Sequence, residues 1–319
     1  MSISSDLSRP LGIALGVLLD AALADPRRGH PVALFGTAAQ ALERRLYGDS
    51  RAPGIAHVAL CVGAVTGLGV LASRTRSPYL KTGLTAAATW AVLGGTTLAR
   101  EGAYMADALE RDDLAAARKR LPHLCGREPD GLGAHELARA TVESLAENTS
   151  DAVVAPLVWG AVAGIPGLLA YRVINTLDAM VGHHSPRYER FGWAAAKLDD
   201  VANYVPARLT GFLTVAAAPV VGGSVQSALA VLKRDGHQHP SPNAGRCEAA
   251  FAGALGRTLG GTNVYGSRVE HRPEMGEGPG PTVPDIRRSV RLARTVSLAA
   301  AGVSVLAAWG IAAARARKG

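Results

Sequence analysis

The chain has 319 residues, of which 48% are hydrophobic and 5% aromatic, and its formal net charge is +8. This length accommodates one large domain or two modest ones. Because aromatic residues are few and no basic run is interleaved with them, we expect no nucleic acid partner. The positive charge fits either arginine-rich cytoplasmic loops or an anionic ligand such as a nucleotide. Cys61, Cys125 and Cys247 form no Cys-x-x-Cys pair, so neither a disulfide framework nor a zinc site is predicted.

Apolar stretches alternate with charge-rich stretches along the whole chain, and the mean hydropathy is +0.13. This alternation is typical of a polytopic membrane protein with sizeable polar loops. We therefore predict an all-α fold: a polytopic integral membrane helical bundle with broken or re-entrant helices and polar helical loops, forming a single membrane-embedded domain over 1–319. The candidate membrane segments are 11–23, 53–72, 82–99, 152–170, 205–232 and 295–314.

The N-terminal part begins with the short apolar segment 11–23, which is too short for a simple span. Asp25 and His30 then flank a turn, and an amphipathic helix follows. Such an Asp–His pair is more often structural than functional. Segments 53–72 and 82–99 are joined by a short loop and are expected to form a helical hairpin.

Residues 100–150 are predicted to form soluble-looking amphipathic helices. Within them, Glu136, Glu143, Glu147 and Asp151 are spaced by seven, four and four residues, so a helix would place them on one face. Neighbouring acids repel one another unless a cation or hydrogen-bond donors lie between them. The face is either simply solvated or a ledge for magnesium and phosphate.

The apolar segment 152–170 contains Pro156, Gly164, Pro166 and Gly167, so we expect a broken or re-entrant helix. Polar groups directly precede it in "AENTSD", which would form the rim of a cavity. A buried carboxylate at such a boundary is costly without a partner or a task.

Two further polar groups lie at apolar boundaries. Asn175 and Asp178 are three residues apart and share a helix face. In "AAAKLDDVANYVPARLTG" a helical Asp-Asp-x-x-Asn motif is flanked by cations, and it includes Lys197, Asp199, Asp200, Asn203 and Arg208. The motif could hold a metal bound to phosphate oxygens, or it could be an internally paired salt-bridge cluster.

Residues 205–232 are apolar and interrupted by Pro219, Gly222 and Gly223, while 233–294 are polar and rich in glycine and proline. Within the polar stretch, "EMGEGPGPTVPD" is predicted to be a loop. His239, Ser241 and Asn243 precede a small-residue helix, whose N-terminus they could cap and where an anion would be favoured.

The chain contains no signature of a covalent nucleophile. Asp, Glu, Asn, Lys and Arg instead recur at polar–apolar boundaries, a pattern that suits the positioning of a nucleotide and the stabilisation of phosphoryl charge.

Taken together, these stretches resemble the CobD/CbiB cobalamin-biosynthesis proteins, the adenosylcobinamide-phosphate synthases. Six segments match in the family's order and span about residues 15–295. They are "DPRRGHPV", "EGAYMADALERDDLAAARKRLPHLCGRE", "ATVESLAENTSDAVVAPL", "YRVINTLDAMVG", "YERFGWAAAKLDDVANYVPARLT" and "HPSPNAGRCEAAFAGALG". The chain departs from the family pattern at Ala24, Glu128, Ala152 and His183, but these changes remove no carboxylate or amide.

The resemblance implies a multi-pass enzyme of the cell membrane with its active site facing the cytoplasm. Such an enzyme joins adenosylcobyric acid, a cobalt-containing corrinoid substrate, to (R)-1-amino-2-propanol or its O-phosphate. The family is ATP- and Mg²⁺-dependent, and ATP would activate the carboxylate as an acyl phosphate. Membrane lipid and other late corrin-pathway enzymes are the further partners expected.

The site hypothesis assigns catalytic roles to boundary acids, of which Asp178 or Glu143 would deprotonate the amine. The catalytic candidates are Glu143, Glu147, Asp151, Asp178 and Asp200, and the metal candidates are Glu147, Asp151, Asp199 and Asp200. The substrate- or nucleotide-binding candidates are Asp25, His30, Asn148, Asn175, Lys197, Asn203, Arg208, His239, Ser241 and Asn243.

Other functions remain open on the sequence. An Mg-dependent intramembrane transferase acting on diphosphate substrates also uses aspartates at helix ends, but it normally has paired motifs, whereas only 199–203 is dense in aspartate. A non-catalytic membrane sensor or scaffold would leave the boundary acids without a reason, and a soluble metal-binding module fits least well.

Overall fold

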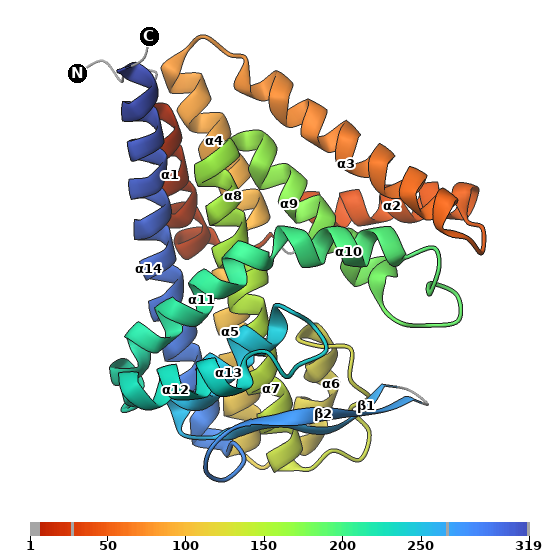
Figure 1. Cartoon of the computed structure of the whole chain (residues 1–319), viewed down its shortest axis with the longest axis vertical. Helices are drawn as coiled ribbons and strands as arrows, with labels where there is room; N and C mark the ends of the chain where they lie inside the picture. The colour runs from red at the N-terminus through yellow and green to blue at the C-terminus, as the bar shows by residue number, and fades with distance from the viewer. Residues whose placement is uncertain (1–6, 27–28, 266–267, 318–319) are drawn as a thin grey trace. The chain divides into compact units, whose positions relative to one another are not determined.

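The computed structural model describes residues 7–26, 29–265 and 268–317, and it is mostly helical (Figure 1). Contacts divide the chain into two compact units. Unit 1 comprises the described parts of Met1–Gly94, Ala155–Asn203 and Ala300–Gly319, and unit 2 comprises Gly95–Val154 and Tyr204–Ala299. The single membrane-embedded domain stays a prediction.

Unit 1 is built from helices. They are α1 (Ser8–Leu23), α2 (Pro31–Leu46), α3 (Arg51–Ser73), α4 (Pro78–Val92), α8 (Ala155–Ala163), α9 (Ile165–Leu177), the π-helical turn η4 (Asp178–Gly182), α10 (Trp193–Ala202) and the C-terminal part of α14 (Val283–Ala316).

Small residues allow α1 and α4 to pack closely. A Cβ atom on Gly12 would lie 2.5 Å from the Cβ of Thr85, and one on Gly16 would lie 2.4 Å from the Cβ of Thr89. Glycines spaced four apart form a groove that lets two helix backbones approach each other, as in membrane helix pairs. The main partner of α4 is therefore α1, while α3 packs mainly against α9.

The predicted hairpin of 53–72 and 82–99 is accordingly wrong in its pairing. Figure 1 shows α3 diverging from α4 beyond their short connection. The boundaries of 82–99 are wrong as well, because α4 ends at Val92 and the next helix begins at Gly95. Leu93 is extended, with ψ of 152°, and two consecutive glycines follow it, a sequence that disfavours a continuous helix.

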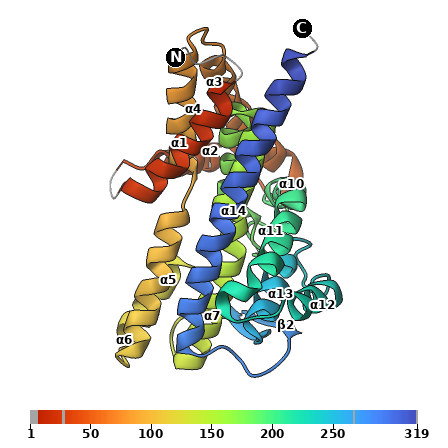
Figure 2. The ribbon, with the colours of Figure 1, turned by 90° about the vertical axis from the view of Figure 1, so that its left-hand side faces the viewer.

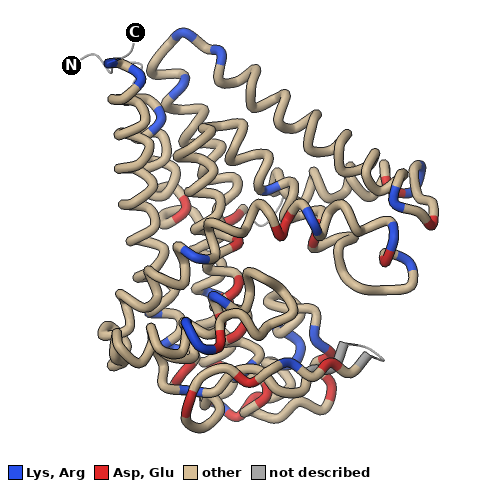
Figure 3. The backbone as a smooth tube through the Cα atoms, in the orientation of Figure 1, with Lys and Arg blue, Asp and Glu red and all other residues tan. Residues whose placement is uncertain are grey.

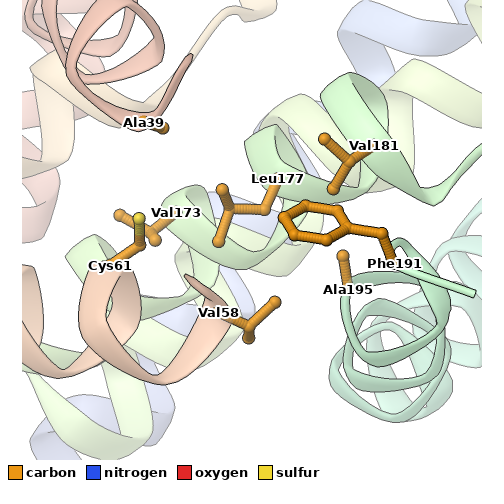
Figure 4. Close-up of a cluster of buried hydrophobic side chains, with 8 residues drawn as sticks. All are labelled: Ala39, Val58, Cys61, Val173, Leu177, Val181, Phe191 and Ala195. Carbon is orange, nitrogen blue, oxygen red and sulfur yellow. The ribbon is translucent and has the colours of Figure 1, made fainter. Parts of the chain in front are cut away.

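A buried apolar cluster holds several helices of unit 1 together (Figure 4). It brings together side chains from α2, α3, α9, η4 and α10 with Phe191 from the preceding loop. Its members are Ala39, Val58, Cys61, Val173, Leu177, Val181, Phe191 and Ala195. Close backbone contacts support it, since a Cβ on Gly54 would lie 1.9 Å from the carbonyl oxygen of Phe191. This cluster fixes η4 against α3.

The predicted break within 152–170 is confirmed. Helix α8 ends at Ala163, Gly164 adopts φ of +67°, and α9 begins at Ile165 with Pro166 in its first turn. The guanidinium of Arg9 donates through Nη1 to the carbonyl oxygens of Ala161 and Val162, both at 3.2 Å, so it satisfies groups that the end of α8 leaves open.

Unit 2 combines helices with one hairpin. Its elements are α5 (Gly95–Glu110), α6 (Leu114–Arg120), η2 (Leu121–His123), α7 (Ala134–Thr149), the π-helical turn η3 (Ser150–Val154), α11 (Tyr204–Ala217), η5 (Ala218–Val221), α12 (Val225–Asp235), α13 (Ala244–Leu255), β1 (Thr258–Tyr265), β2 (Arg268–Gly276) and the N-terminal part of α14. The small-residue helix α13 packs against α7, α11 and α12.

The hairpin corrects the all-α prediction. Strands β1 and β2 pair antiparallel, with a bulge between Leu259 and Gly261, within 233–294, which the sequence analysis describes as polar and rich in glycine and proline without predicting strands. Gly260 at the bulge adopts φ of +97°, a conformation that favours glycine. The predicted loop 274–285 is also shorter than expected, because β2 extends to Gly276 and α14 begins at Val283.

Three helical stretches are long and apolar enough to cross a membrane: Arg51–Ser73, Tyr204–Val221 and Val283–Ala316. They correspond to the predicted segments 53–72, the first part of 205–232, and 295–314. Helix α14 is one continuous helix of 34 residues (Figure 2). Charged residues are sparse along α1, α3 and α4 and frequent in unit 2 (Figure 3).

The α1–α4 contact gives a stability prediction. Gly16→Leu should lower the free energy of unfolding by about 1–3 kcal/mol, because the side chain would overlap Thr89. Gly63→Leu on α3 is the matched control, since a Cβ there would meet nothing within 4 Å. Denaturant unfolding of both variants in detergent tests this, and equal stability would contradict the packing.

Candidate functional site

In unit 1, the carboxylate of Asp199 is held by two amides. Asn203 Nδ2 donates to Asp199 Oδ2 at 3.0 Å, and Asn175 Nδ2 donates to Asp199 Oδ1 at 3.4 Å. The hydroxyl of the buried Tyr171 in turn donates to Asn203 Oδ1 at 2.8 Å. The structure thus brings together three predicted residues from α9 and from the region of α10. Tyr171 was missed, and only its place in a predicted family segment could have suggested it.

Asp178 begins the π-helical turn η4 and is half-buried. Its position depends on Gly182, because a Cβ on Gly182 would lie 1.9 Å from Asp178 Oδ1. A π-helical turn widens the helix by one residue and frequently marks a functional site. The turn therefore places the Asp178 carboxylate beside Gly182, where any larger residue would displace it.

The remaining predicted residues of unit 1 include two ion pairs. Lys197 Nζ lies 3.5 Å from Asp200 Oδ2 on the same helix, and Lys197 is exposed. Such an exposed pair contributes little to stability. His30 Nδ1 accepts from the backbone N–H of Val32 at 3.1 Å and caps α2. His30 Nε2 lies 3.4 Å from Asp25 Oδ1, which agrees with the structural interpretation of this pair.

In unit 2, Glu143 is a buried anchor. Its Oε2 pairs with Arg127, and its Oε1 accepts from the backbone N–H of Gly260 at 2.7 Å. Arg139, one turn earlier on α7, donates to the carbonyl oxygens of Gly260 and Thr262. Arg139 and Glu143, one turn apart on α7, therefore bind the carbonyl oxygen and the N–H of Gly260 at the bulge. With both oxygens engaged, Glu143 is better suited to positioning than to accepting a substrate proton.

Glu147 and Asp151 remain accessible. Glu147 is exposed to solvent, and Asp151, in the π-helical turn η3, is half-buried. Surrounding protein raises the pKa of Glu147 by desolvation, against the opposing charges of Arg272 and Arg127. Solvent still reaches this carboxylate, although the surrounding protein crowds it. Asn148 Nδ2 donates to the carbonyl oxygen of Ser144 at 2.9 Å, one turn earlier on α7.

Glu248 is a buried carboxylate that the sequence analysis missed. It is fully buried on α13, and neither of its oxygens has a hydrogen-bond partner among the described residues. Arg272 Nη1 lies 3.7 Å and His239 Nε2 lies 3.8 Å from Glu248 Oε1. Burial, followed by the charges of Glu143 and Glu147, raises its pKa well above the usual value. The signal in the sequence was a lone Glu among the small residues of α13.

His239 is held by its backbone. Its Nδ1 accepts from the N–H of Ser241 at 2.9 Å, and burial, followed by the charge of Arg272, lowers its pKa from 6.5 to about 4. Ser241 Oγ accepts from the N–H of Ala244 at 3.2 Å and caps α13, as predicted. Arg208 Nη1 donates to Asn243 Oδ1 at 3.2 Å, which joins α11 to the same cap.

The four predicted metal ligands are divided between the units. Glu147 and Asp151 belong to unit 2, and Asp199 and Asp200 to unit 1. Within the described part of the chain, no group of three or more His, Cys, Asp or Glu side chains could hold a metal ion. The assignment of metal ligands stays a prediction.

His239 predicts a dependence of stability on pH. Between pH 6.5 and about 4 the unfolded chain binds the proton of this histidine more readily than the folded chain, so the free energy of unfolding falls as pH falls. Above this window the contribution is constant. The full difference amounts to about 3 kcal/mol.

Unfolding in detergent at several pH values, compared between wild type and His239→Asn, measures this contribution. The variant should show a shallower fall between pH 6.5 and 4. His184→Asn is the control, because that histidine is exposed on a loop. Parallel pH profiles of wild type and His239→Asn would contradict the assignment.

Comparison with known proteins places this chain in a family. The family model described as CobD/Cbib protein matches residues 13–293. A protein named cobalamin biosynthesis protein CobD from Mycobacterium tuberculosis is 54% identical over 94% of this chain and 96% of its own length. Relatives of the same name from Geobacter metallireducens (44% identical; 83% and 86% covered) and Rhizobium meliloti (39%; 92% and 94%) also match. No solved structure gives a significant match. The chain belongs to the CobD/CbiB family.

Proposed function

We propose that this chain is a membrane enzyme of cobalamin biosynthesis that forms an amide between adenosylcobyric acid and (R)-1-amino-2-propanol or its O-phosphate, with ATP and Mg²⁺. Membership of the family and the names of the relatives support the pathway. The observation that carries the chemistry is the pair of accessible acids, Glu147 and Asp151, that follows the buried anchor Glu143 on consecutive turns.

Amide formation from a carboxylate and an ammonium ion sets three requirements. One carboxylate oxygen must become a leaving group, the ammonium must lose a proton, and the negative charge that develops must be stabilised. When bound, Mg²⁺–ATP supplies the phosphoryl group that turns the oxygen into a leaving group. The chain's own residues must hold the reactants and accept the proton.

Glu147 and Asp151 suit Mg²⁺ on phosphate. Mg²⁺ is usually held by one or two carboxylates together with phosphate oxygens and water, so a complete protein cage is not required. Both side chains are accessible and lie on consecutive turns. Arg208, which belongs to the same unit, is the proposed phosphate partner, while the roles assigned to Lys197, Asp199 and Asp200 of unit 1 stay predictions. Arg208 stacks over Tyr204, with its Cζ 3.4 Å from the ring centroid, so its guanidinium is held in place.

Asp178 is the proposed base for the ammonium proton. Glu143, the other candidate from the sequence, has both oxygens engaged by Arg127 and Gly260. Asp178 is half-buried on η4, close in sequence to Asn175, whose amide already orients Asp199. Gly182 leaves room for this carboxylate on the turn, and a base must be positioned before it can accept a proton.

The function is tested by mass spectrometry on membranes that contain the protein. Adenosylcobyric acid, Mg²⁺–ATP and either amine should give a corrinoid heavier by the amine minus water, and only when ATP is present. Failure with both amines, in membranes where the protein is folded, would overturn the ligase. Transfer from a diphosphate substrate would then be the next assay.

The Mg²⁺ dependence of the same assay can be compared between variants of Asp151 and Glu136. Asp151→Asn should raise the Mg²⁺ concentration needed for half-maximal rate, because one carboxylate ligand is lost. Glu136→Gln on the same helix is the control, since Glu136 only caps α7 by accepting from the N–H of Gly133 at 2.7 Å. An unchanged Mg²⁺ dependence in Asp151→Asn would contradict its role.

If Asp178 is the base, substitutions of Asp178 and of the adjacent Gly182 should both lower kcat. Asp178→Asn should lower kcat by about 100-fold or more if the carboxylate is the base. Gly182→Ala should also lower kcat, because the methyl group would displace Asp178 Oδ1. Gly36→Ala is the control, as its nearest neighbour would be Met180 Sδ at 3.8 Å. A Gly182→Ala enzyme with wild-type kcat would count against this placement.

A further inference from the structure

A basic collar lies at the N-terminal end of α3 in unit 1. We define the collar as Arg44 and Arg45 at the end of α2, Arg51 at the start of α3, and Arg187 and Arg190 from the loop before α10. Contacts across the chain join its parts. Arg187 Nη2 lies 3.0 Å from Glu43 Oε1, and Arg190 Nη1 lies 3.7 Å from Asp49 Oδ2. Residues far apart in sequence therefore present one cluster of guanidinium groups.

Aromatic side chains fix the centre of the collar. The guanidinium of Arg187 lies over the ring of Tyr47 at 4.0 Å and over that of Tyr188 at 5.5 Å. The hydroxyl of Tyr188 donates to the buried Glu43 at 2.9 Å, and the hydroxyl of Tyr47 donates to the carbonyl of Arg187 at 3.0 Å. Although held from several sides, the Arg187 side chain remains 52% exposed. Its free edge can still take an anion.

The collar carries an excess of exposed positive charge. Glu43 and Asp49 pair with Arg187 and Arg190, but Arg44 and Arg45 have no carboxylate partner among the described residues. Arg51 lies over the ring of Trp193 at 4.9 Å. Cation–π contacts leave the hydrogen-bonding edge of a guanidinium available, and this edge matches the oxygens of a phosphate.

The position of the collar favours a lipid headgroup as the anion. Helix α3 has 23 residues, begins at Arg51 and is apolar enough to cross a membrane. Its exposed apolar side chains start at Ile55 and continue to Leu71. Trp and Tyr gather where membrane helices meet the headgroups, and arginines at this level bind anionic lipids. The collar has this composition at the end of such a helix.

We propose that the collar binds the phosphate of anionic phospholipids at the membrane surface and so fixes the depth of unit 1 in the bilayer. The inference is independent of the ligase reaction. The site is an open rim of guanidinium groups supported by aromatic rings, and it suits a headgroup phosphate that approaches along α3.

The test is native mass spectrometry of the purified full-length protein released from detergent with phosphatidylglycerol or phosphatidylcholine. Wild type should retain several-fold more phosphatidylglycerol than phosphatidylcholine. The triple variant Arg44→Gln, Arg45→Gln, Arg51→Gln should lose this preference. These side chains are exposed and lie outside the polar network around Glu43, so the fold should be kept.

The matched control is Arg74→Gln with Arg76→Gln, two exposed arginines at the other end of α3. This variant should keep the wild-type preference. Equal retention of phosphatidylglycerol by the triple variant and wild type would overturn the proposal. Displacement of bound phosphatidylglycerol by millimolar inorganic phosphate or ATP would also overturn it, because the collar would then be a site for soluble anions.

Discussion

The polar interior of unit 2 depends on the ion pair between Glu143 and Arg127. A carboxylate taken out of water must be matched by donors, and here a guanidinium and a backbone N–H supply them. The N–H belongs to Gly260, whose positive φ at the bulge turns it toward α7. A small two-stranded hairpin is marginal alone, so this contact gives β1 and β2 a fixed place on the helices. The hairpin in turn brings Arg272 to Glu248.

Departures from regular helix coincide with the acids that the proposed reaction uses. Asp151 lies in the π-helical turn after α7, and Asp178 begins the one after α9. Between the two turns, Gly164 interrupts the helix and Arg9 covers the open carbonyls. Distorted turns cost stability and persist where the surroundings enforce them, which is a common property of functional sites. The polar groups that precede 152–170 therefore lie where the helix becomes distorted, and not at the end of one regular helix.

Local patterns in the sequence predicted local features well. The apolar run of α3, the break at Gly164, and the neighbouring positions of Asp199 and Asn203 all follow from spacing or from residue type. Contacts between distant segments could not be predicted in this way. The short loop after α3 suggested a hairpin with α4, whereas the glycines of α1 offered α4 a closer fit. The strands β1 and β2 were missed because their glycines weaken any alternating pattern.

The acids of α7 show why a shared helix face does not imply a shared role. Glu136 caps the first turn, Glu143 is buried against Arg127, and Glu147 is open to solvent, although a regular helix places all three on one face. The difference arises from what each turn meets, because the bulge of the hairpin covers Glu143 and leaves Glu147 uncovered. A buried carboxylate whose two oxygens are both engaged stabilises the fold, whereas one that solvent reaches can exchange water for a cation. Within this row, Glu147 is therefore the acid best suited to the cation that the proposed reaction requires.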